Sequence, residues 1–437
     1  MNLLLVCKGF RRAVWLCVMP FAAFAQDRRI VIEPKAPPVC TVLRARLALH
    51  DGRLSGDDES KLDTDRIQQA INACREGSAV ELAPDGMMSA FLIGPVRIPA
   101  RRTLVVEGEA TVMGPRYPRL YDVQPGSCGA ANYEPPECKP TISVHVAIMG
   151  EGVVDGRGGE TLLGTGNRWW DLAEKARAGG RRQVPRLIVA DHSNNFVVDG
   201  VTLRNSSNFH LVFTDGYGFA VWNVKIDTPR SARNSVGIDQ GGAADITVRD
   251  SFIRTGDDNI AIKGGKGGVA YMMIDDNHFY SGHGMPIGSE TFGGVHGIWA
   301  KNLTLDGTDN GVRIKSNRSR GGVVERVTYS NICMRNARWP IVLDTQCDSP
   351  APQPHRFPVY RDILLKSVRI SGSGHNSLEG IDADHPISVV LDGVSLDNPQ
   401  AYTMSAKHAL ITYGLGAVTS DSWARMLRPR MCPEQQS

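Results

Sequence analysis

Two carboxylates stand side by side in residues 255–263, which read TGDDNIAIK. Asp257 and Asp258 come directly before a run of apolar, β-branched residues that is typical of a strand. Like charges held this close resist ionising together, so mutual repulsion keeps one proton on the pair at mildly acidic pH. A carboxylic acid beside a carboxylate can perform acid–base chemistry, in which one group donates a proton and the other activates water.

A histidine and two cations follow in two later stretches. His283 stands in SGHGMPIGSE, and Arg313 and Lys315 alternate in DNGVRIKS. An imidazole can tune the proton of a nearby carboxyl, and paired cations can hold a ligand carboxylate by charge-assisted hydrogen bonds. Each pattern alone also has an ordinary structural explanation, because paired aspartates and GHG occur in turns and alternating cations occur on solvated strand faces. Their chemistry therefore depends on whether the fold brings them together.

Short β-rich runs recur through the second half of the chain. Each run alternates apolar residues, carries a small or polar pair, and alternates again, as in FVVDGVTLRNS and GIWAKNLTLDG. The small residues that mark the runs are Gly200, Asn223, Ser251, Asn277, Asn302, Asn331, Ser367 and Gly393, in steps of 23, 28, 26, 25, 29, 36 and 26 residues. No long helical segment separates the runs, which excludes βαβ units. A leucine ladder is absent, and a propeller blade needs a longer repeat.

The repeat predicts an all-β solenoid, a parallel β-helix whose coils stack about 4.8 Å apart. Upstream, KLDTDRIQQAINAC predicts a helix over 64–74, with Thr64 or Asp63 as its N-cap. We expect this helix to cover the exposed N-terminal end of the core. Its apolar stripe comprises Ile67, Ala70, Ile71 and Cys74.

Stacked coils turn residues one period apart into neighbours. Asp257 lies six residues after the marker Ser251, and His283 lies six residues after the marker Asn277. The two side chains are therefore expected to lie close together in consecutive coils. One coil further on, the cations of DNGVRIKS are expected on the same face.

The N-terminus predicts a secretory signal over residues 1–25. Three basic residues flank the apolar run AVWLCVMPFAAFA, which ends in a small-x-small pattern with cleavage expected after Ala25. The run is too short for a comfortable membrane span, so we expect a soluble exported protein with one catalytic domain over 26–437. Its 46 basic and 46 acidic residues give a mature net charge near zero, which argues against nucleic acid or a membrane as a partner.

Seven cysteines remain after residue 25, and export favours disulfides between them. Cys128 and Cys138 would close a short loop, and Cys40 with Cys74 is a reasonable second pair. The remaining cysteines, Cys333, Cys347 and Cys432, leave one odd thiol that the sequence does not assign. No C-x-x-C pattern occurs, which argues against a metal cluster.

In this order, GDDN, SGHGMPIGSE and DNGVRIKS resemble the polygalacturonases of glycoside hydrolase family 28. The segments VVDGRGG, WWDLAEKA, PRLI, SSNFHLVFTDGYGF and TPRSARN resemble the secreted bacterial members. The resemblance runs from about residue 40 past residue 345. It implies a right-handed parallel β-helix with an open groove, and inverting hydrolysis of α-1,4-galacturonan without a metal or other cofactor.

The resemblance also implies a role for each residue that matches a motif. Asp257 is expected to donate the proton, and Asp258 to help activate water. His283 is expected to support the protonation of the acid. Arg313 and Lys315 are expected to bind galacturonate carboxylates.

One motif departs from the family pattern. The family usually shows Asn-Thr-Asp-Gly-x-Asp, whereas this chain has NSVGID from Asn234 to Asp239. Val236 replaces a water-activating aspartate, and a valine side chain accepts no hydrogen bond. Either Asp258 acts alone, or Asp239 assists it. Asn234 and Lys263 complete the expected substrate-binding residues.

These observations favour a secreted polygalacturonase that is endo-acting, monomeric and specific for de-esterified pectin. Val236 motivates a second hypothesis, a weakened or inactive homologue that binds pectin. A pectate lyase shares the β-helix, but it needs calcium, and the set of carboxylates and histidine argues against it. A structural scaffold rarely carries a histidine, two acids and two cations on consecutive coils.

Overall fold

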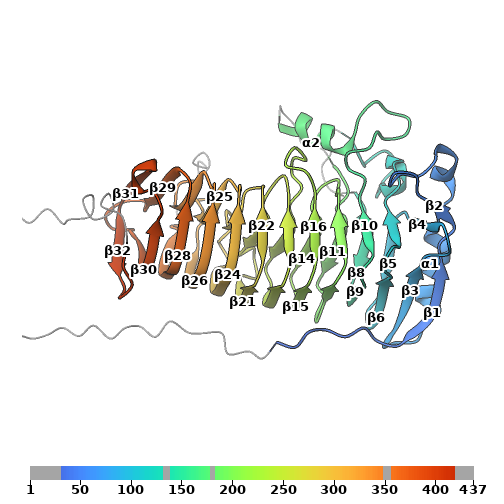
Figure 1. Cartoon of the computed structure of the whole chain (residues 1–437), viewed down its shortest axis with the longest axis horizontal. Coiled ribbons are helices and arrows are strands. Elements are labelled where there is room, and N and C mark those ends of the chain that lie inside the picture. Colours follow the sequence, from blue (N-terminus) through green and yellow to red (C-terminus); the bar gives the residue numbers. More distant parts are fainter. Residues whose placement is uncertain (1–30, 131–137, 178–182, 348–355, 419–437) are drawn as a thin grey trace, which may run out of the picture.

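The chain folds into an elongated parallel β-helix, as predicted (Figure 1). The computed structural model describes residues 31–130, 138–177, 183–347 and 356–418. Two curved sheets of 21 and 11 strands wind around one continuous apolar core. Except for β2 and β4, the strands within each sheet pair in parallel, so each coil lies on the one before it.

The eleven-stranded sheet contains one strand from each successive coil. Its strands are β5 (Val96–Ile98), β8 (Ile142–Val144), β11 (Ile188–Asp191), β14 (Leu211–Thr214), β17 (Ile238–Gly241), β20 (Ile260–Lys263), β23 (Met285–Ile287), β25 (Asn310–Lys315), β27 (Trp339–Asp344), β29 (Gly374–Glu379) and β31 (Tyr402–Lys407).

The second sheet covers the remaining faces of the coil. Its strands are β1 (Val39–Arg44), β2 (Leu47–Ala48), β3 (Ser78–Ala83), β4 (Met88–Leu92), β6 (Arg102–Val106), β7 (Thr111–Met113), β9 (Ala147–Met149), β10 (Val153–Asp155), β12 (Val197–Asp199), β13 (Thr202–Arg204), β15 (Tyr217–Trp222), β16 (Lys225–Asp227), β18 (Ala244–Arg249), β19 (Phe252–Arg254), β21 (Val269–Asp275), β22 (His278–Tyr280), β24 (Val295–Asp306), β26 (Val323–Arg335), β28 (Val359–Ser371), β30 (Ile387–Leu396) and β32 (Ala409–Tyr413).

Successive side chains of each strand point to opposite faces of the sheet, so alternate residues enter the core and the others reach the surface. Five residues stand in register across consecutive coils of the eleven-stranded sheet and are fully buried: Ile262, Ile287, Ile314, Leu343 and Leu378. Arg313 and Lys315 flank Ile314 and are therefore directed to the opposite face of the sheet. This ladder fixes the register of every outward residue beside it.

Two of the predicted coil markers are wrong by one residue. The strand register aligns Asn223 with Asp250 and Asp276, rather than with Ser251 and Asn277. Asp250 and Asp276 have the positive φ that Asn223 also has, while Ser251 N–H donates to Asn277 Oδ1 inside the coil at 3.0 Å. Both predicted markers lie one residue too far toward the C-terminus. Because the shift is the same in both coils, the predicted alignment of Asp257 with His283 is unaffected.

The predicted N-terminal helix is present as α1 (Thr64–Ala73), which contacts β3 and β5 at one end of the coil (Figure 1). Its stripe is buried at Ile67 and Ile71. Asp63 occupies the N-cap position but accepts from Arg66 Nε at 2.8 Å instead of capping the backbone. Thr64 Oγ1 accepts from Gly94 N–H at 2.7 Å, so this side chain ties the helix to the first coil.

The two predicted disulfides are present. Cys40 joins Cys74 across Cα atoms 5.9 Å apart, and Cys128 joins Cys138 across 5.0 Å. The first bond ties strand β1 to the end of α1. The second closes the loop whose interior, 131–137, lies outside the described residues.

Of the three remaining cysteines, two lie among the described residues and Cys432 does not. Cys333 is exposed on β26, and the backbone N–H of Cys347 donates to Ser316 O at 2.9 Å. Cys432 and the predicted signal over residues 1–25 both lie outside the described part of the chain. The pairing of the odd thiol therefore stays open.

A second helix, α2 (Trp169–Arg177), lies on the loops along one edge of the coil (Figure 1). The shorter 3₁₀ segments are Gly56–Ser60, Pro118–Tyr121 and Pro399–Ala401. Trp169 is buried against Tyr121, with ring centroids 6.0 Å apart. Trp170 Nε1 donates to Ser206 O at 2.9 Å, so the helix is joined to the coil by a hydrogen bond as well as by packing.

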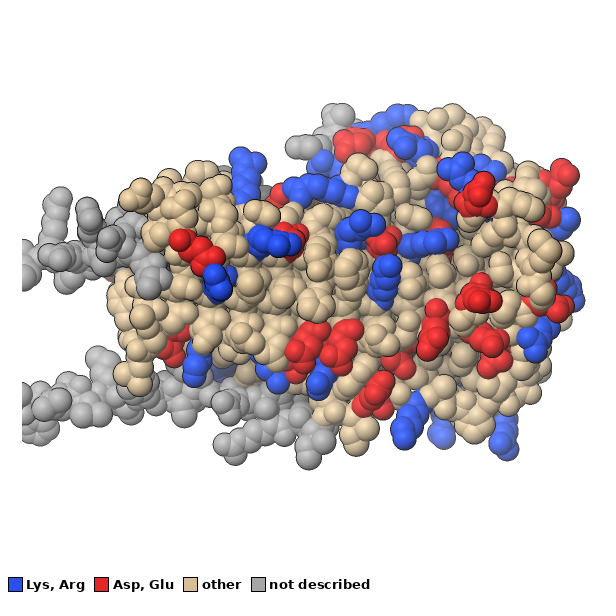
Figure 2. Space-filling view, viewed as in Figure 1, with Lys and Arg blue, Asp and Glu red and all other residues tan. Residues whose placement is uncertain are grey.

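Charge is mixed on the outer surface. Figure 2 shows lysines and arginines interspersed with aspartates and glutamates across the face in view, without a large field of either sign. Exposed pairs such as Arg254 with Asp227 and Arg369 with Asp397 connect adjacent coils. Among the described residues, no helix is long and apolar enough to cross a membrane.

Truncating the buried stripe of α1 should destabilise the N-terminal end. We expect Ile67→Ala to lower the free energy of unfolding by about 2–5 kcal/mol, because it leaves a cavity between α1 and the first coil. Denaturant unfolding measures this change. Gln69 is an exposed neighbour, so Gln69→Ala should stay within about 0.5 kcal/mol. Equal effects of the two substitutions would contradict a capping role for α1.

Candidate active site

Four consecutive coils contribute the predicted site residues. The segments involved are the loops that precede β17, β20, β23 and β25, together with strands β17, β20 and β25 themselves. Gly237 N–H donates to Asp258 O at 2.9 Å, and Asn259 N–H donates to Gly284 O at 2.8 Å. Asn310 Nδ2 donates to His283 O at 3.0 Å. These bonds fix the loops to one another, so the side chains are positioned by a rigid frame.

The structure brings Asp257, Asp258 and His283 together, as the coil spacing predicts. His283 N–H donates to Asp257 O at 2.9 Å. Its Nδ1 lies 3.4 Å from Asp257 Oδ1 and 3.5 Å from Asp258 Oδ1. One imidazole nitrogen therefore faces both carboxylates of the pair.

The charges of this cluster act on one another. Hydrogen bonds and charge from Asp257 and Asp258 outweigh burial and raise the pKa of His283 to about 9. Burial raises the pKa of Asp257, but the hydrogen bond and charge of His283 outweigh it and lower that pKa below the ordinary value. The imidazolium therefore favours the ionised form of Asp257 and opposes the repulsion between the two aspartates.

Asp258 lies deeper in the cluster than Asp257. The residue is 7% exposed, and its buried Oδ1 faces His283 Nδ1 at 3.5 Å. A carboxylate oxygen offers two lone pairs, so Oδ1 can accept a further hydrogen bond. Asp258 is therefore suited to hold a water molecule beside the acid pair.

Asp239 and Lys263 form a separate pair on neighbouring strands. Lys263 Nζ lies 2.6 Å from the buried Asp239 Oδ1, and both side chains are on the face of the eleven-stranded sheet opposite the core residues Ile238 and Ile262. Burial raises the pKa of Asp239, which the cations of Lys263 and Arg186 only partly offset. The ring of Phe209 lies 5.3 Å from Lys263 Nζ and 5.6 Å from the Arg186 guanidinium. These contacts make a cationic surface around one aromatic face.

Val236 lies one coil before the acid pair and is 3% exposed. Its carbonyl accepts from His210 N–H at 2.9 Å and lies 3.0 Å from His210 Nδ1. Burial lowers the pKa of His210 to about 4, so this imidazole is neutral at ordinary pH. Position 236 thus contributes a backbone carbonyl that is already bonded and a side chain without polar atoms. Asn234, which was expected to bind substrate, is exposed and donates to Asn208 Oδ1 at 3.3 Å.

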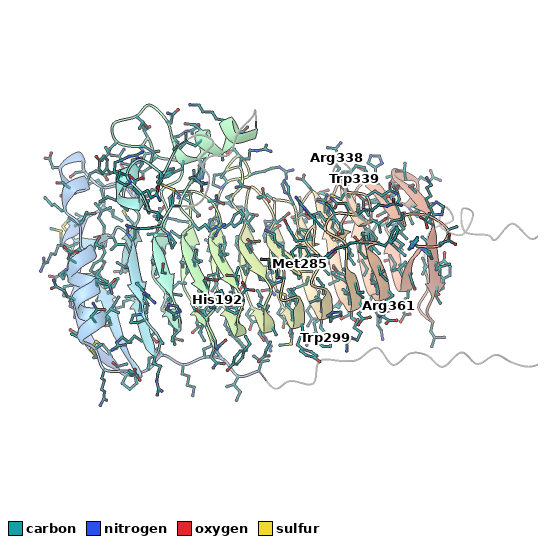
Figure 3. The ribbon with its side chains drawn as sticks, turned by 180° about the vertical axis from the view of Figure 1, so that it is seen from behind. His192, Met285, Trp299, Arg338, Trp339 and Arg361 are labelled. Carbon is teal, nitrogen blue, oxygen red and sulfur yellow. A yellow bond between two sulfur atoms is a disulfide. The ribbon has the colours of Figure 1, made fainter. Side chains whose placement is uncertain are left out.

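An open cleft of about 550 Å³ adjoins the imidazole on its C-terminal side. Its lining residues are His283, Asp309, Asn310, Arg313, Arg338, Trp339, Val342, Asp344, Ser377 and Glu379. Arg313 Nε is buried and has no hydrogen-bond acceptor among the described residues. The charge of Lys315 contributes to the lowered pKa of Asp257. Figure 3 shows Arg338 and Trp339 together at the edge of the coil, where the guanidinium lies 6.0 Å from the ring centroid.

Comparison with known proteins identifies the family. The model of Glycosyl hydrolases family 28 matches residues 131–410. The chain belongs to glycosyl hydrolase family 28. An endo-polygalacturonase of Pectobacterium carotovorum subsp. carotovorum is 39% identical over 388 residues, which cover 87% of this chain and 92% of that protein. A polygalacturonase of Ralstonia nicotianae is 32% identical and is covered to 80%, with 85% of this chain aligned.

A solved structure supports the same assignment. The polygalacturonase from Erwinia carotovora ssp. carotovora superposes with a TM-score of 0.80 at 37% identity. The match covers 89% of this family 28 chain and all of that one. The resemblance stated from the motifs is thereby confirmed, and the chain is a glycoside hydrolase by family.

Several cleft residues of this glycoside hydrolase were missed by sequence reasoning. Asp309 is the first letter of DNGVRIKS, and its Oδ2 lies 3.6 Å from His283 Nε2. The signal was present, because Asp257, His283 and Asp309 follow one another in two steps of 26 residues. Trp339 and Phe209 had no comparable signal, since single aromatic residues on strands and loops usually pack in a core.

Within the described ranges, two residue clusters have donor atoms close enough to hold a cation. One is Asp257, Asp258 and His283, and the other is the exposed set Asp191, His192 and Asp215, each with its ligand atoms within 4.8 Å of one another. Such clusters are common without an ion. In the first cluster, the same oxygen and nitrogen atoms can instead exchange protons.

The ion pairs of His283 should make stability depend on pH. The folded-state pKa is raised, so the contribution is fully present below the unfolded value of about 6.5 and is lost as pH rises through about 9. Because the side chain is 40% exposed, we expect a loss on the order of 1 kcal/mol. Denaturant unfolding at pH 6 and pH 10 measures it. His283→Gln should remove this difference, and a pH-independent difference between the two proteins would contradict the assignment.

Proposed function

We propose that this chain is a polygalacturonase that hydrolyses the α-1,4 bonds of de-esterified pectin, with endo action and inversion of configuration. The observation that carries the proposal is the carboxylate pair under one imidazole beside Arg313 and Lys315, in a chain whose relatives include endo-polygalacturonases. An anionic sugar polymer requires such cations, because its carboxylates bind through charge-assisted hydrogen bonds. The open cleft leaves room for a polymer to lie across the coils.

In the proposed mechanism, Asp257 protonates the leaving oxygen of the glycosidic bond. Its pKa is low in the free protein because His283 and Lys315 act on it. A galacturonate carboxylate bound by Arg313 and Lys315 neutralises part of that positive charge and raises the pKa of Asp257. Substrate binding therefore favours protonation of Asp257, which later donates that proton to the leaving oxygen.

Asp258 is the base in this proposal. Its buried Oδ1 lies 3.5 Å from His283 Nδ1 and can accept a further hydrogen bond from the attacking water. Asp239 is already paired with Lys263, and the side chain at Val236 accepts nothing. Lys263 and its neighbours Arg186 and Phe209 are then a binding surface for sugars on the N-terminal side of the cleavage point.

Removing the acid tests the activity. We expect Asp257→Asn to lower release of reducing ends from polygalacturonate by about 10²–10⁴-fold between pH 4 and pH 7, because it removes the proposed proton donor to the leaving group. Asp227→Asn is a control, since Asp227 pairs with Arg254 on the outer surface. If the wild type released no more than Asp257→Asn at any of these pH values, the proposed activity would be wrong.

Restoring a second carboxylate tests the base. We expect Val236→Asp to raise kcat by about tenfold or more, because a second acceptor would orient the attacking water. Val236→Asn introduces a side chain of similar size to aspartate but without its charge, so it should raise kcat little. Both substitutions bury a polar group, so their unfolding free energies are measured alongside. Equal kcat in the wild type and Val236→Asp would mean that Asp258 suffices.

Val236 also supports a second candidate, a homologue that binds pectin without cleaving it. Calorimetry with oligogalacturonates, beside the reducing-end assay, distinguishes the two. Binding by the wild type without product would favour the binder, whereas the family relationship favours the enzyme. A pectate lyase would produce unsaturated products that absorb ultraviolet light, and the carboxylate–histidine cluster argues against it.

The remaining expectations form part of the same proposal. A signal over 1–25 would direct export and leave one domain over 26–437 that acts as a monomer on the polysaccharide. Cations that read free carboxylates should favour de-esterified polymer. Product configuration by NMR and product length on a series from trigalacturonate to polymer test inversion and endo action.

A further inference from the structure

The imidazole of His283 has carboxylates on two opposite sides. Its Nδ1 faces Asp257 and Asp258 at 3.4 and 3.5 Å, and its Nε2 faces Asp309 Oδ2 at 3.6 Å. Asp257, His283 and Asp309 occupy equivalent positions in three consecutive coils. The third carboxylate is not required to bring His283 to the acid pair, so its place beside Nε2 calls for a separate explanation.

Asp309 is itself held from several directions. Its backbone N–H donates to Gly282 O at 2.8 Å, and its carbonyl accepts from Trp339 N–H at 2.8 Å. The other carboxylate oxygen, Oδ1, is paired with Arg230 Nη2, and Arg230 Nη1 donates to Gly307 O at 2.8 Å. Each oxygen of Asp309 therefore has a different partner, one cation and one imidazole nitrogen.

Arg230 reaches this point from the loop before β17, three coils earlier in the sequence. Its loop lies directly on the loop that carries Asp257. At Gly256, a Cβ would come within 2.1 Å of Ala232 O and 2.9 Å of Arg230 O, so only glycine fits there. The arginine side chain thus passes over the loops of the two intervening coils and binds Asp309, which lies on the side of His283 away from the acid pair.

We propose that Asp309 is a positioning residue for His283, and that Arg230 fixes Asp309 so that the imidazole keeps one orientation against the acid pair. The proposal rests on the proposed function for its kinetic consequence, but the contact between His283 and Asp309 does not. An imidazole with an acceptor on one side can rotate or change tautomer. Acceptors on both nitrogens define its orientation and favour the doubly protonated ring.

Arg230 also balances charge around the imidazole. The ionisable groups that face His283 or line the same cleft are Asp257, Asp258, Asp309, Arg313, Arg338, Asp344 and Glu379. Arg230 lies behind Asp309, and the charge of Lys315 acts on Asp257. Without Arg230, three carboxylates would surround one cation. With it, Asp309 is neutralised on one oxygen and still available to His283 on the other.

The ion pair between Arg230 and Asp309 is exposed to solvent, which argues against a role in stability alone. The side chains of Arg230 and Asp309 are 56% and 33% exposed. An ion pair so accessible to water contributes little to folding. Substitutions here should therefore leave a folded protein whose site can be measured.

The test is Asp309→Asn, with Asp306→Asn as the matched control. Asp306 lies three residues earlier and pairs with Arg335 on the outer surface. NMR of the free full-length protein gives the pKa and tautomer of His283, and kcat and KM on polygalacturonate follow against pH. For Asp309→Asn we expect a fall in the pKa of His283 of about one unit, about a tenfold loss of kcat, and a KM within about twofold of wild type. Asp306→Asn should change none of these.

A second pair of variants separates positioning from charge. Arg230→Gln should lower kcat in the same way as Asp309→Asn, and Arg230→Lys should recover most of it. The proposal is overturned if the pKa and tautomer of His283 do not respond to Asp309→Asn, or if Asp306→Asn moves them equally. If the wild type proves inactive on polygalacturonate, the proposed function fails, while the NMR result still decides whether Asp309 positions His283.

Discussion

Hydrogen bonds between the parallel strands of successive coils set the position of every side chain at the site. They hold neighbouring strands about 4.8 Å apart and allow no slip, because a shift by one residue would turn the ladder of Ile262, Ile287 and Ile314 out of the core. The fixed register also sets the positions of the side chains on the outer surface. Asp257, His283 and Asp309 meet because each occupies the same place in its own coil.

Compensation of charge decides how this crowded site behaves. Two adjacent carboxylates alone would share a proton, but His283 sits against both and keeps the pKa of Asp257 low. One strand away the balance differs, because burial raises the pKa of Asp239 and the cation of Lys263 only partly offsets it. An anionic ligand that competes for these cations would change the protonation of both sites.

Much of this arrangement could be predicted from the sequence, and the exceptions have physical reasons. The period of the β-rich runs gave the fold and placed Asp257 beside His283. It misplaced the markers at Ser251 and Asn277, because each follows an aspartate that is equally able to adopt positive φ. Arg230 could not be predicted, since its contact depends on a loop that crosses two coils. The pairing of Asp239 with Lys263 was missed because it depends on the register between strands of successive coils, which unequal loop lengths hide in the sequence.

The ladder of buried residues also limits how the protein can respond to a bound polymer. A cleft laid on one continuous sheet has no hinge about which two lobes could close, and each coil is fastened to both neighbours by main-chain bonds. The polysaccharide must then supply the flexibility, bending its own linkages to meet fixed charges. Successive sugars would encounter coils spaced about 4.8 Å apart, each with its own set of charged and aromatic side chains.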